Sequence, residues 1–197
     1  MSDSTRQSRF QQLAMPHMDA AYNLARWLAG NTHDAEDITQ EAFLRAYRFF
    51  DTFRGDDARA WLLKVVRNTF YSQWRQERSR GSSVEFDEDA HSPTGEEAAW
   101  APGQASGNPE AIYARGEEIR RLDEALAGLP VEYREALVLR ELEDLPYKEI
   151  AATLDVPIGT VMSRLARGRR LLLENFKRTS GDNDELQRSS ETVRRIR

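Results

Sequence analysis

The chain offers few of the side chains on which enzymes rely for catalysis. It has no cysteine and only three histidines, His17, His33 and His91, which lie in separate segments. No glycine-rich phosphate-binding loop and no metal-ligand spacing accompanies them. The acidic residues between positions 34 and 41 fit a solvated helix start, where the helix dipole favours carboxylates. We therefore expect a protein that is not an enzyme and that holds neither a cofactor nor a metal ion.

Charge is distributed unevenly along the sequence. The formal net charge is -5, with 28 Lys and Arg against 33 Asp and Glu, and this balance alone does not indicate nucleic-acid binding. Residues 59–80, however, contain six basic residues and one acidic residue, and residues 161–178 have the same ratio. Residues 81–109 carry six acidic residues and no basic one. The two local basic patches, rather than the net charge, indicate contact with an anionic partner.

Residues 146–173 have the pattern of a helix-turn-helix. The pattern predicts a short helix over residues 146–154, a turn over 155–159 and a second helix with Thr160 as its N-cap. One face of the second helix packs, through Val161, Leu165, Gly168 and Leu172. The opposite face carries hydroxyl and guanidinium groups, from Thr160, Ser163, Arg164, Arg167 and Arg170. Such a face suits the major groove of DNA, where arginine binds guanine bidentately or holds phosphates.

This segment resembles the promoter-recognition domain of extracytoplasmic-function (ECF) sigma factors of RNA polymerase. The resemblance is carried by Leu129-Pro130, Arg134, residues 147–151, Gly159-Thr160-Val161, Ser163-Arg164-Leu165 and Arg167-Gly168-Arg169. The family's domain reads the minus-35 element, which implies that Thr160, Ser163, Arg164 and Arg167 contact DNA. Arg170, at the edge of the same face, is expected to hold a phosphate. The chain departs from the family at Met162 and Ala166, which leaves the base preference open.

The N-terminal half contains a second matching segment. Residues 34–47 resemble the family's core-binding helix, which docks on the clamp coiled coil of the polymerase large subunit. The periodicity turns Ile38, Ala42 and Phe49 inward. The outward strip mixes carboxylate, amide, leucine and arginine side chains, from Asp37, Gln40, Glu41, Leu44, Arg45 and Arg48. The resemblance implies that this strip binds core RNA polymerase, whereas without it the strip would be read as a solvated helix face.

Residues 53–68, continued through Tyr71, Trp74, Arg75 and Arg78, resemble the family's minus-10 reader. Aromatic rings interleaved with arginine can stack on unpaired bases and neutralise the backbone of melted DNA. The expected minus-10 contacts are Arg54, Asp56, Trp61, Arg67, Asn68, Tyr71 and Arg75. Trp61 also fits a place in the helical core beside Leu62, Val65 and Val66, and we favour the core for this side chain.

The expected fold is all-α, with two small helical domains joined by a flexible acidic linker. A flexible N-terminus covers residues 1–12, and a sigma-2-like domain covers 13–78. The linker spans 79–115, where 12 of 37 positions are Gly, Pro or Ser and no periodicity survives. A sigma-4-like domain with the helix-turn-helix spans 116–178, and a disordered tail follows over 179–197. We expect the linker to let the free protein vary the distance between its domains.

The two matching segments together indicate a sigma factor that binds core RNA polymerase and directs it to promoter DNA. The family also implies an anti-sigma factor as a partner. No leader or apolar run long enough to span a membrane is apparent, so we expect a cytoplasmic protein. The alternative is a helix-turn-helix regulator that acts without being a polymerase subunit. Such a regulator would usually carry a receiver domain of alternating strands and helices, and the sequence shows no such pattern.

Overall fold

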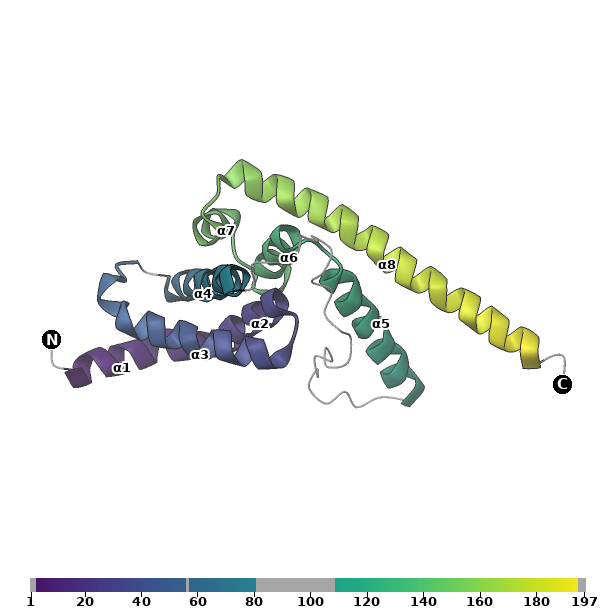
Figure 1. Ribbon diagram of the computed structural model, residues 1–197, viewed down its shortest axis with the longest axis horizontal. Coiled ribbons are helices and arrows are strands. Elements are labelled where there is room, and N and C mark those ends of the chain that lie inside the picture. The colour runs from purple at the N-terminus through teal and green to yellow at the C-terminus, as the bar shows by residue number, and fades with distance from the viewer. Residues whose placement is uncertain (1–2, 56, 81–108, 195–197) are drawn as a thin grey trace.

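A computed structural model describes residues 3–55, 57–80 and 109–194 of the chain. Within these ranges all the regular secondary structure is helical and no strand is assigned, which confirms the all-α prediction for the part described. The helices form two groups, α1–α4 and α5–α8, which we call the first and the second unit (Figure 1). No helix in the described part of the chain is long and apolar enough to cross a membrane.

The first unit is built around three helices, α2, α3 and α4, which all contact one another. Its elements are α1 (Asp3–Ala14), η1 (Met15–His17), α2 (Met18–Ala29), α3 (Thr32–Arg48), η2 (Phe50–Thr52) and α4 (Ala58–Arg80). Gly30 ends α2 with a φ of 80°, a left-handed conformation that glycine adopts at little cost. Asn31 then caps α3, because its side-chain oxygen accepts from the Asp34 amide at 2.9 Å. The core consists of apolar side chains such as Leu24, Ile38, Leu62, Leu63 and Val66.

The N-terminal segment differs from the flexible stretch expected for residues 1–12. It forms α1, whose Phe10 is buried and meets the rings of Phe43, Tyr47 and Phe50 edge-on. Arg6 lies over the Tyr47 ring and donates to the Tyr47 carbonyl oxygen at 2.7 Å. These contacts come from α3 and η2, and a residue 40 positions away is invisible to local periodicity. Tertiary packing therefore orders a helix whose own sequence gives little sign of one.

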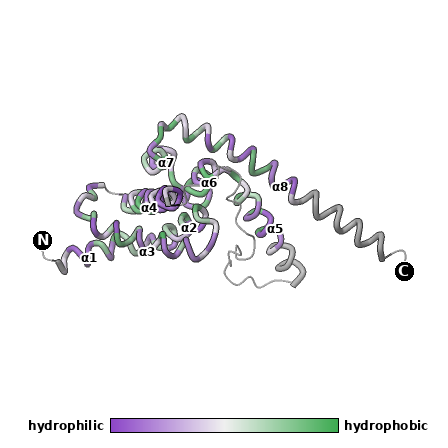
Figure 2. Tube along the Cα trace, viewed as in Figure 1, coloured by the Kyte–Doolittle hydropathy of each residue, from purple (hydrophilic) through white to green (hydrophobic). Residues whose placement is uncertain are grey.

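The second unit contains α5 (Pro109–Ala127), α6 (Val131–Leu137), a π-helical turn η3 (Val138–Leu142), α7 (Tyr147–Leu154) and α8 (Ile158–Arg194). Its core is formed by buried side chains such as Leu137, Leu139, Ile150, Val161 and Leu165. Figure 2 shows apolar and polar residues alternating along the helices, as amphipathic packing requires. α8 continues as helix to Arg194, beyond residue 179, where the sequence predicts the start of a disordered tail.

The two units lie against each other. α4 of the first unit contacts α7 of the second, and α2 contacts α6 and η3. α5 and α8 extend away from this contact toward the right of Figure 1. The sequence predicts a linker that lets the distance between the two units vary. In the structure the two units are in direct contact. Residues 81–108, which make up most of the predicted linker, lie outside the described part of the chain.

Candidate nucleic-acid interface

α7, a short turn and the start of α8 form the helix-turn-helix that the sequence predicts. Asp155 ends α7 in a left-handed conformation with a φ of 56°, and α8 starts three residues later. Ile150 and Leu154 of α7 and Val161 and Leu165 of α8 are all buried. This packing fixes the rotation of α8, so the face opposite Val161 and Leu165 is directed outward.

The prediction that Thr160 caps the second helix is wrong. α8 begins two residues earlier, at Ile158, and the Thr160 amide donates to the Pro157 carbonyl oxygen at 2.9 Å. Proline has a fixed φ that suits a helix start, so helical geometry begins directly after Pro157. Thr160 therefore lies inside the first turn, where its carbonyl oxygen accepts from the Ser163 hydroxyl at 2.9 Å.

The five candidate minus-35 residues all lie in the first half of α8, but they differ in accessibility. Ser163, Arg167 and Arg170 are exposed, and Thr160 is partly exposed. Arg170 faces Glu174 one turn later, with 3.7 Å between Nε and Oε1, a separation at which a surface ion pair contributes little. These four side chains can reach a DNA groove without any rearrangement of the fold.

Arg164 is placed differently from the other four. Its Nη1 lies 3.1 Å from Oε1 of Glu135, a carboxylate on α6 that is only 1% exposed. Ionised groups in a buried site form charge-assisted hydrogen bonds that are stronger than those at a surface. Arg164 is therefore held inward in this structure. The sequence predicts that it contacts DNA, but here its guanidinium group binds Glu135 instead.

The candidate minus-10 residues are also divided by the structure. Arg54 in the loop before α4, and Asn68 and Arg75 on α4, are exposed. Arg67 and Tyr71 instead turn toward the second unit, where both reach Glu135. Asp56 lies outside the described residues.

Tyr71 and Arg67 form a compact cationic and aromatic pair on α4. The Arg67 guanidinium lies 4.6 Å from the centre of the Tyr71 ring, and its Nε donates to Glu135 at 2.9 Å. Burial, followed by the charge of Glu135, raises the pKa of the Tyr71 hydroxyl above its ordinary value. The hydroxyl is thus a proton donor throughout the physiological range, and it donates to Glu135 over 3.2 Å.

Trp61 packs in the first unit, as the core alternative proposes. Its ring centre lies 5.0 Å from that of Phe53 and 6.2 Å from that of Phe50, and the side chain is half-buried. An indole in this aromatic cluster supports the loop that carries Arg54. Direct stacking of Trp61 on a base stays a prediction that no contact in the structure tests.

The candidate polymerase-binding strip lies along one side of α3. Asp37, Gln40 and Arg48 are exposed, and Leu44 is 61% exposed although it is apolar. Glu41 and Arg45 pair across one turn at 2.6 Å. The opposite side of the helix is buried through Ala35, Ile38, Ala42 and Ala46.

In the described residues no group of three or more His, Cys, Asp or Glu could hold a metal ion.

Phe49 was expected to face inward with Ile38 and Ala42, and that expectation is wrong. Phe49 is 54% exposed, and its neighbour Phe50 is buried instead. α3 ends at Arg48 and a 3-10 turn follows, so the spacing of the α-helix no longer applies at Phe49.

Two carboxylates that join the units, Glu135 and Glu143, were not predicted from the sequence. Both are buried, and both accept from residues at least 64 positions earlier in the chain, as well as Arg164 in the case of Glu135. A signal was present at Glu135, which lies one helical turn before the buried Leu139 and thus on the apolar face. An acidic residue on a buried face requires a hydrogen-bonded cationic partner. The pattern could have found the need for a partner, but not which arginine supplies it.

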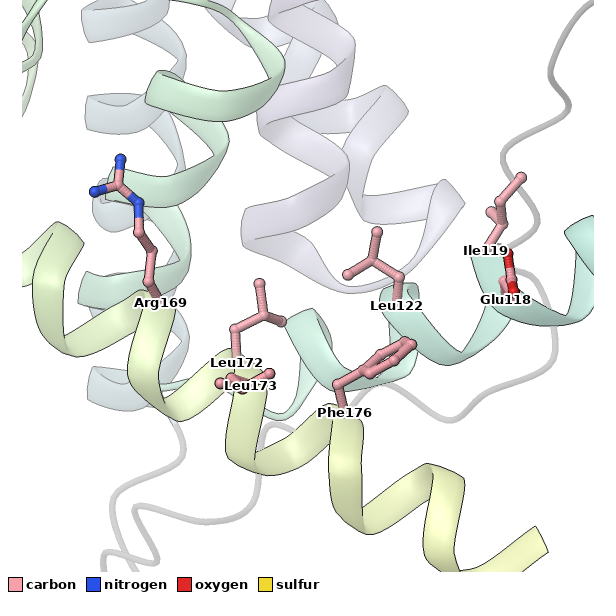
Figure 3. Close-up of a pocket in the computed structure, with 7 residues that line it drawn as sticks. All are labelled: Glu118, Ile119, Leu122, Arg169, Leu172, Leu173 and Phe176. Atoms are coloured by element: carbon pink, nitrogen blue, oxygen red, sulfur yellow. The ribbon is translucent and has the colours of Figure 1, made fainter. Parts of the chain in front are cut away.

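A groove of about 780 Å³ lies between α5 and α8 (Figure 3). It is lined by Glu118, Ile119, Leu122, Arg169, Leu172, Leu173 and Phe176. Leu122 and Leu173 are 42% and 53% exposed, whereas Leu126, one turn after Leu122, is buried. The second unit therefore leaves apolar side chains accessible where these two helices extend away from its core.

Comparison with known families matches both units. The model of sigma-70 region 2 matches residues 13–80, and the model of sigma-70 region 4 matches residues 119–172. The first match covers the candidate polymerase and minus-10 residues on α3 and α4. The second covers the helix-turn-helix with all five candidate minus-35 residues.

Curated relatives are similar in sequence to this protein along most of the chain. The ECF RNA polymerase sigma factor SigE of Mycolicibacterium smegmatis is 36% identical over 91% of this chain and 66% of the relative's length. The ECF RNA polymerase sigma-E factor of Escherichia coli K12 is 40% identical over 71% of this chain and 72% of the relative's length. The chain thus spans about two thirds of the length of these relatives.

Solved structures share the fold. The sigma factor RpoE from Bartonella quintana, in complex with the anti-sigma factor NepR, has a TM-score of 0.67 and 28% identity, over 86% of this chain and 97% of that one. CnrH, in complex with the cytosolic domain of CnrY, has a TM-score of 0.56 and 22% identity, over 85% of this chain and 87% of that one. The second likeness bears on the fold alone.

Proposed function

Because the chain belongs to the ECF family of RNA polymerase sigma factors, a family of non-enzymatic initiation factors, we propose that it binds core RNA polymerase and directs it to promoter DNA. The observation that carries the proposal is the presence of two different exposed surfaces, one in the part that matches region 2 and one in the part that matches region 4. The first is the mixed polar and apolar strip of α3, and the second is the basic face of α8.

The α3 strip is proposed to bind core polymerase. Leu44 at its centre would be desolvated by a partner helix, and the surrounding Gln40, Arg45 and Asp37 would supply the polar rim that such contacts have. Replacing both Gln40 and Arg45 by alanine should weaken binding to core polymerase, measured by fluorescence anisotropy, without lowering the Tm. The matched control is Arg120→Ala with Glu124→Ala, an exposed ion pair on α5. Equal affinities for the wild type and the α3 variant would refute this assignment.

The exposed face of α8 is proposed to read the minus-35 element in duplex DNA. Arg167 lies near the centre of the face and is proposed to bind a guanine, whereas Arg170 at its edge is proposed to bind a phosphate. Arg167→Ala should cost about 1 to 3 kcal/mol and relax the preference at one base pair, and Arg170→Ala should weaken all sequences alike. Ser163 and Thr160 add hydroxyl groups that can donate or accept beside these arginines.

Arg169 provides a control for the loss of charge on the same helix. It carries the same guanidinium group as Arg167, but it pairs with Glu141 of η3 at 2.7 Å. Arg169→Ala should therefore reduce transcription much less than Arg167→Ala and should leave the preference unchanged. If transcription from a set of promoter variants responded identically to both substitutions, base reading by Arg167 would be excluded.

α4 and the loop before it are proposed to hold the melted minus-10 strand. Arg54, Asn68 and Arg75 are open to solvent. We assign Arg67, Tyr71 and Asp56 to the same set, with Trp61 as support. Arginine beside aromatic rings suits single-stranded DNA, where each stacked base contributes about 1 to 3 kcal/mol. Asn68→Ala should reduce open-complex formation, followed by permanganate reactivity of unpaired thymines, while duplex minus-35 binding stays unchanged.

An anti-sigma factor is proposed as a further partner, since the similar RpoE structure contains one. A cytoplasmic location follows from the proposed role, because core polymerase and promoter DNA are found there. Affinity purification of the chain from its own cells tests both partners together. Core polymerase subunits should be recovered with the wild type and lost with the α3 variant, whereas recovery without any polymerase subunit would favour the regulator alternative.

A further inference from the structure

The start of α8 exposes two large apolar side chains beside its basic face. Met162 is 55% exposed and Ile158 is 50% exposed, although both are apolar. The two residues are four positions apart, so they lie on the same side of the helix. Because a helical side chain leans toward the N-terminus, the Met162 thioether lies over the turn that carries Ile158. Together the two side chains form what we call the apolar ridge.

The surroundings leave the apolar ridge open to a partner. Gly159 and Ala166, three positions before and four positions after Met162, share its side of the helix and are exposed. A Cβ at Gly159 would meet no other helix of the described chain within 4 Å. In Figure 1 this end of α8 lies at the upper edge of the molecule. A flat surface, such as the edge of a base pair, can therefore reach the Met162 side chain without displacing any described part of the chain.

The apolar ridge also borders the polar groups that are proposed to read DNA. Ser163 directly follows Met162, and the exposed Arg167 lies little more than one turn further along. In a helix-turn-helix, the N-terminal residues of the second helix contact base edges in the major groove. α8 begins at Ile158, so Met162 lies in its second turn. The apolar ridge would thus enter the groove together with Ser163 and Arg167.

One base offers an apolar group at this edge. Thymine presents its C5-methyl group in the major groove, whereas the other three bases present only hydrogen-bond donors and acceptors there. A thioether has no donor and is a weak acceptor, so it cannot replace the water that hydrates a cytosine amino group or a guanine O6. Methionine is unbranched and adapts its shape to an apolar neighbour. A thymine methyl group therefore matches the chemistry of the apolar ridge.

We propose that Met162, supported by Ile158, reads the C5-methyl group of one thymine in the minus-35 element. This proposal rests on the proposed function, which brings this face of α8 to duplex DNA. It adds a base preference that Ser163 and Arg167 do not supply, because hydrogen bonds to polar base edges do not require a methyl group. Met162 is thus a residue that determines specificity through apolar contact.

Selection from randomised promoters tests the preference. Core polymerase is assembled with the full chain, and promoter fragments with a random minus-35 element are selected by binding. The wild type should enrich a T·A pair at one position, and Met162→Ala should lose that enrichment while it retains the guanine attributed to Arg167. The matched control is Met15→Ala, which removes a methionine that is 43% exposed on η1. This control should select the same sequences as the wild type.

Deoxyuridine isolates the contribution of the methyl group. Replacing the selected thymine by deoxyuridine removes the C5-methyl group and changes nothing else in the duplex. For the wild type, affinity should fall about threefold to fivefold, because burial of one such group contributes about 0.8 kcal/mol. Met162→Gln keeps the length of the side chain but makes it polar, so the same replacement should change affinity by at most about 1.5-fold. Met162→Leu, which stays apolar, should retain most of the wild-type response.

Each other outcome has a definite meaning. An equal loss of affinity on deoxyuridine in the wild type and in Met162→Gln would overturn the proposal. Weakening of all sequences alike by Met162→Ala would also overturn it, because the side chain would then serve the fold or a protein partner. Selection of guanine through Arg167 without any thymine that depends on Met162 would overturn this inference alone. If the wild type enriched no base pair of the minus-35 element, the proposed promoter reading by α8 would itself be wrong.

Discussion

Gly168 lies where α8 packs tightly on α6, and a single added methyl group at this position should weaken the helix-turn-helix. A Cβ at this position would lie 3.1 Å from Leu137 Cδ1, 3.2 Å from Leu137 Cγ and 3.3 Å from Tyr133 Cβ. These separations are shorter than ordinary carbon contacts of about 3.5 to 4.0 Å. Leu137 is buried in the core of the second unit, so it has little space into which to move.

Two effects of opposite sign determine the magnitude for Gly168→Ala. Alanine in a helix interior is favoured over glycine by about 0.8 to 1.0 kcal/mol. Overpacking of a well-filled core costs about 1 to 3 kcal/mol. Because two of the three short contacts are to one buried leucine, we expect the cost to exceed the gain and the free energy of unfolding to fall by about 1 kcal/mol. The Tm should then decrease by roughly 2 to 4 °C for a chain of this size.

Gly116→Ala is the matched control, since it makes the same chemical change in α5 where no atom lies within 4 Å of the new Cβ. Only the helix-propensity gain remains there, so this variant should be more stable than the wild type by about 0.5 to 1 kcal/mol. Urea unfolding followed by circular dichroism measures both. If Gly168→Ala were stabilised as much as Gly116→Ala, the close packing of α8 on Leu137 would be refuted.

Three further substitutions test other parts of the fold. Asn31→Ala removes the cap on the Asp34 amide and should destabilise the protein by about 1 kcal/mol in urea unfolding, with Asn31→Asp retaining most of that stability. Phe10→Ala removes the aromatic contacts of α1 and should cost about 3 kcal/mol, with amide exchange in α1 rising before exchange elsewhere. Burial raises the pKa of Asp123, only partly opposed by Arg26, so its ionised form destabilises the fold at neutral pH. Asp123→Asn should therefore raise the Tm at pH 7, and the gain should vanish below about pH 4, where an ordinary aspartate is protonated in both states.

The helices that carry clear periodicity could be predicted from the sequence. The start of α8 was predicted because Val161 and Leu165 recur at helical spacing, and both side chains are buried. The helix boundaries were less accurate, as Thr160 shows, because the first turn depends on backbone geometry at Pro157 rather than on the hydroxyl pattern. The prediction that Phe49 faces inward was wrong for a related reason. α3 ends at Arg48, so the helical spacing no longer determines which side chain beyond it is buried.

Tertiary contacts set the limit on predicting the site. The outward face of α8 followed from the helical period, and Ser163, Arg167 and Arg170 are exposed as a result. The period alone could not show that Arg164 turns toward Glu135, because the two residues are 29 positions apart and lie on different helices. The same holds for Arg67, whose partner is 68 positions away. Burial of a carboxylate is a property of the whole fold, whereas exposure of a basic face is a property of one helix.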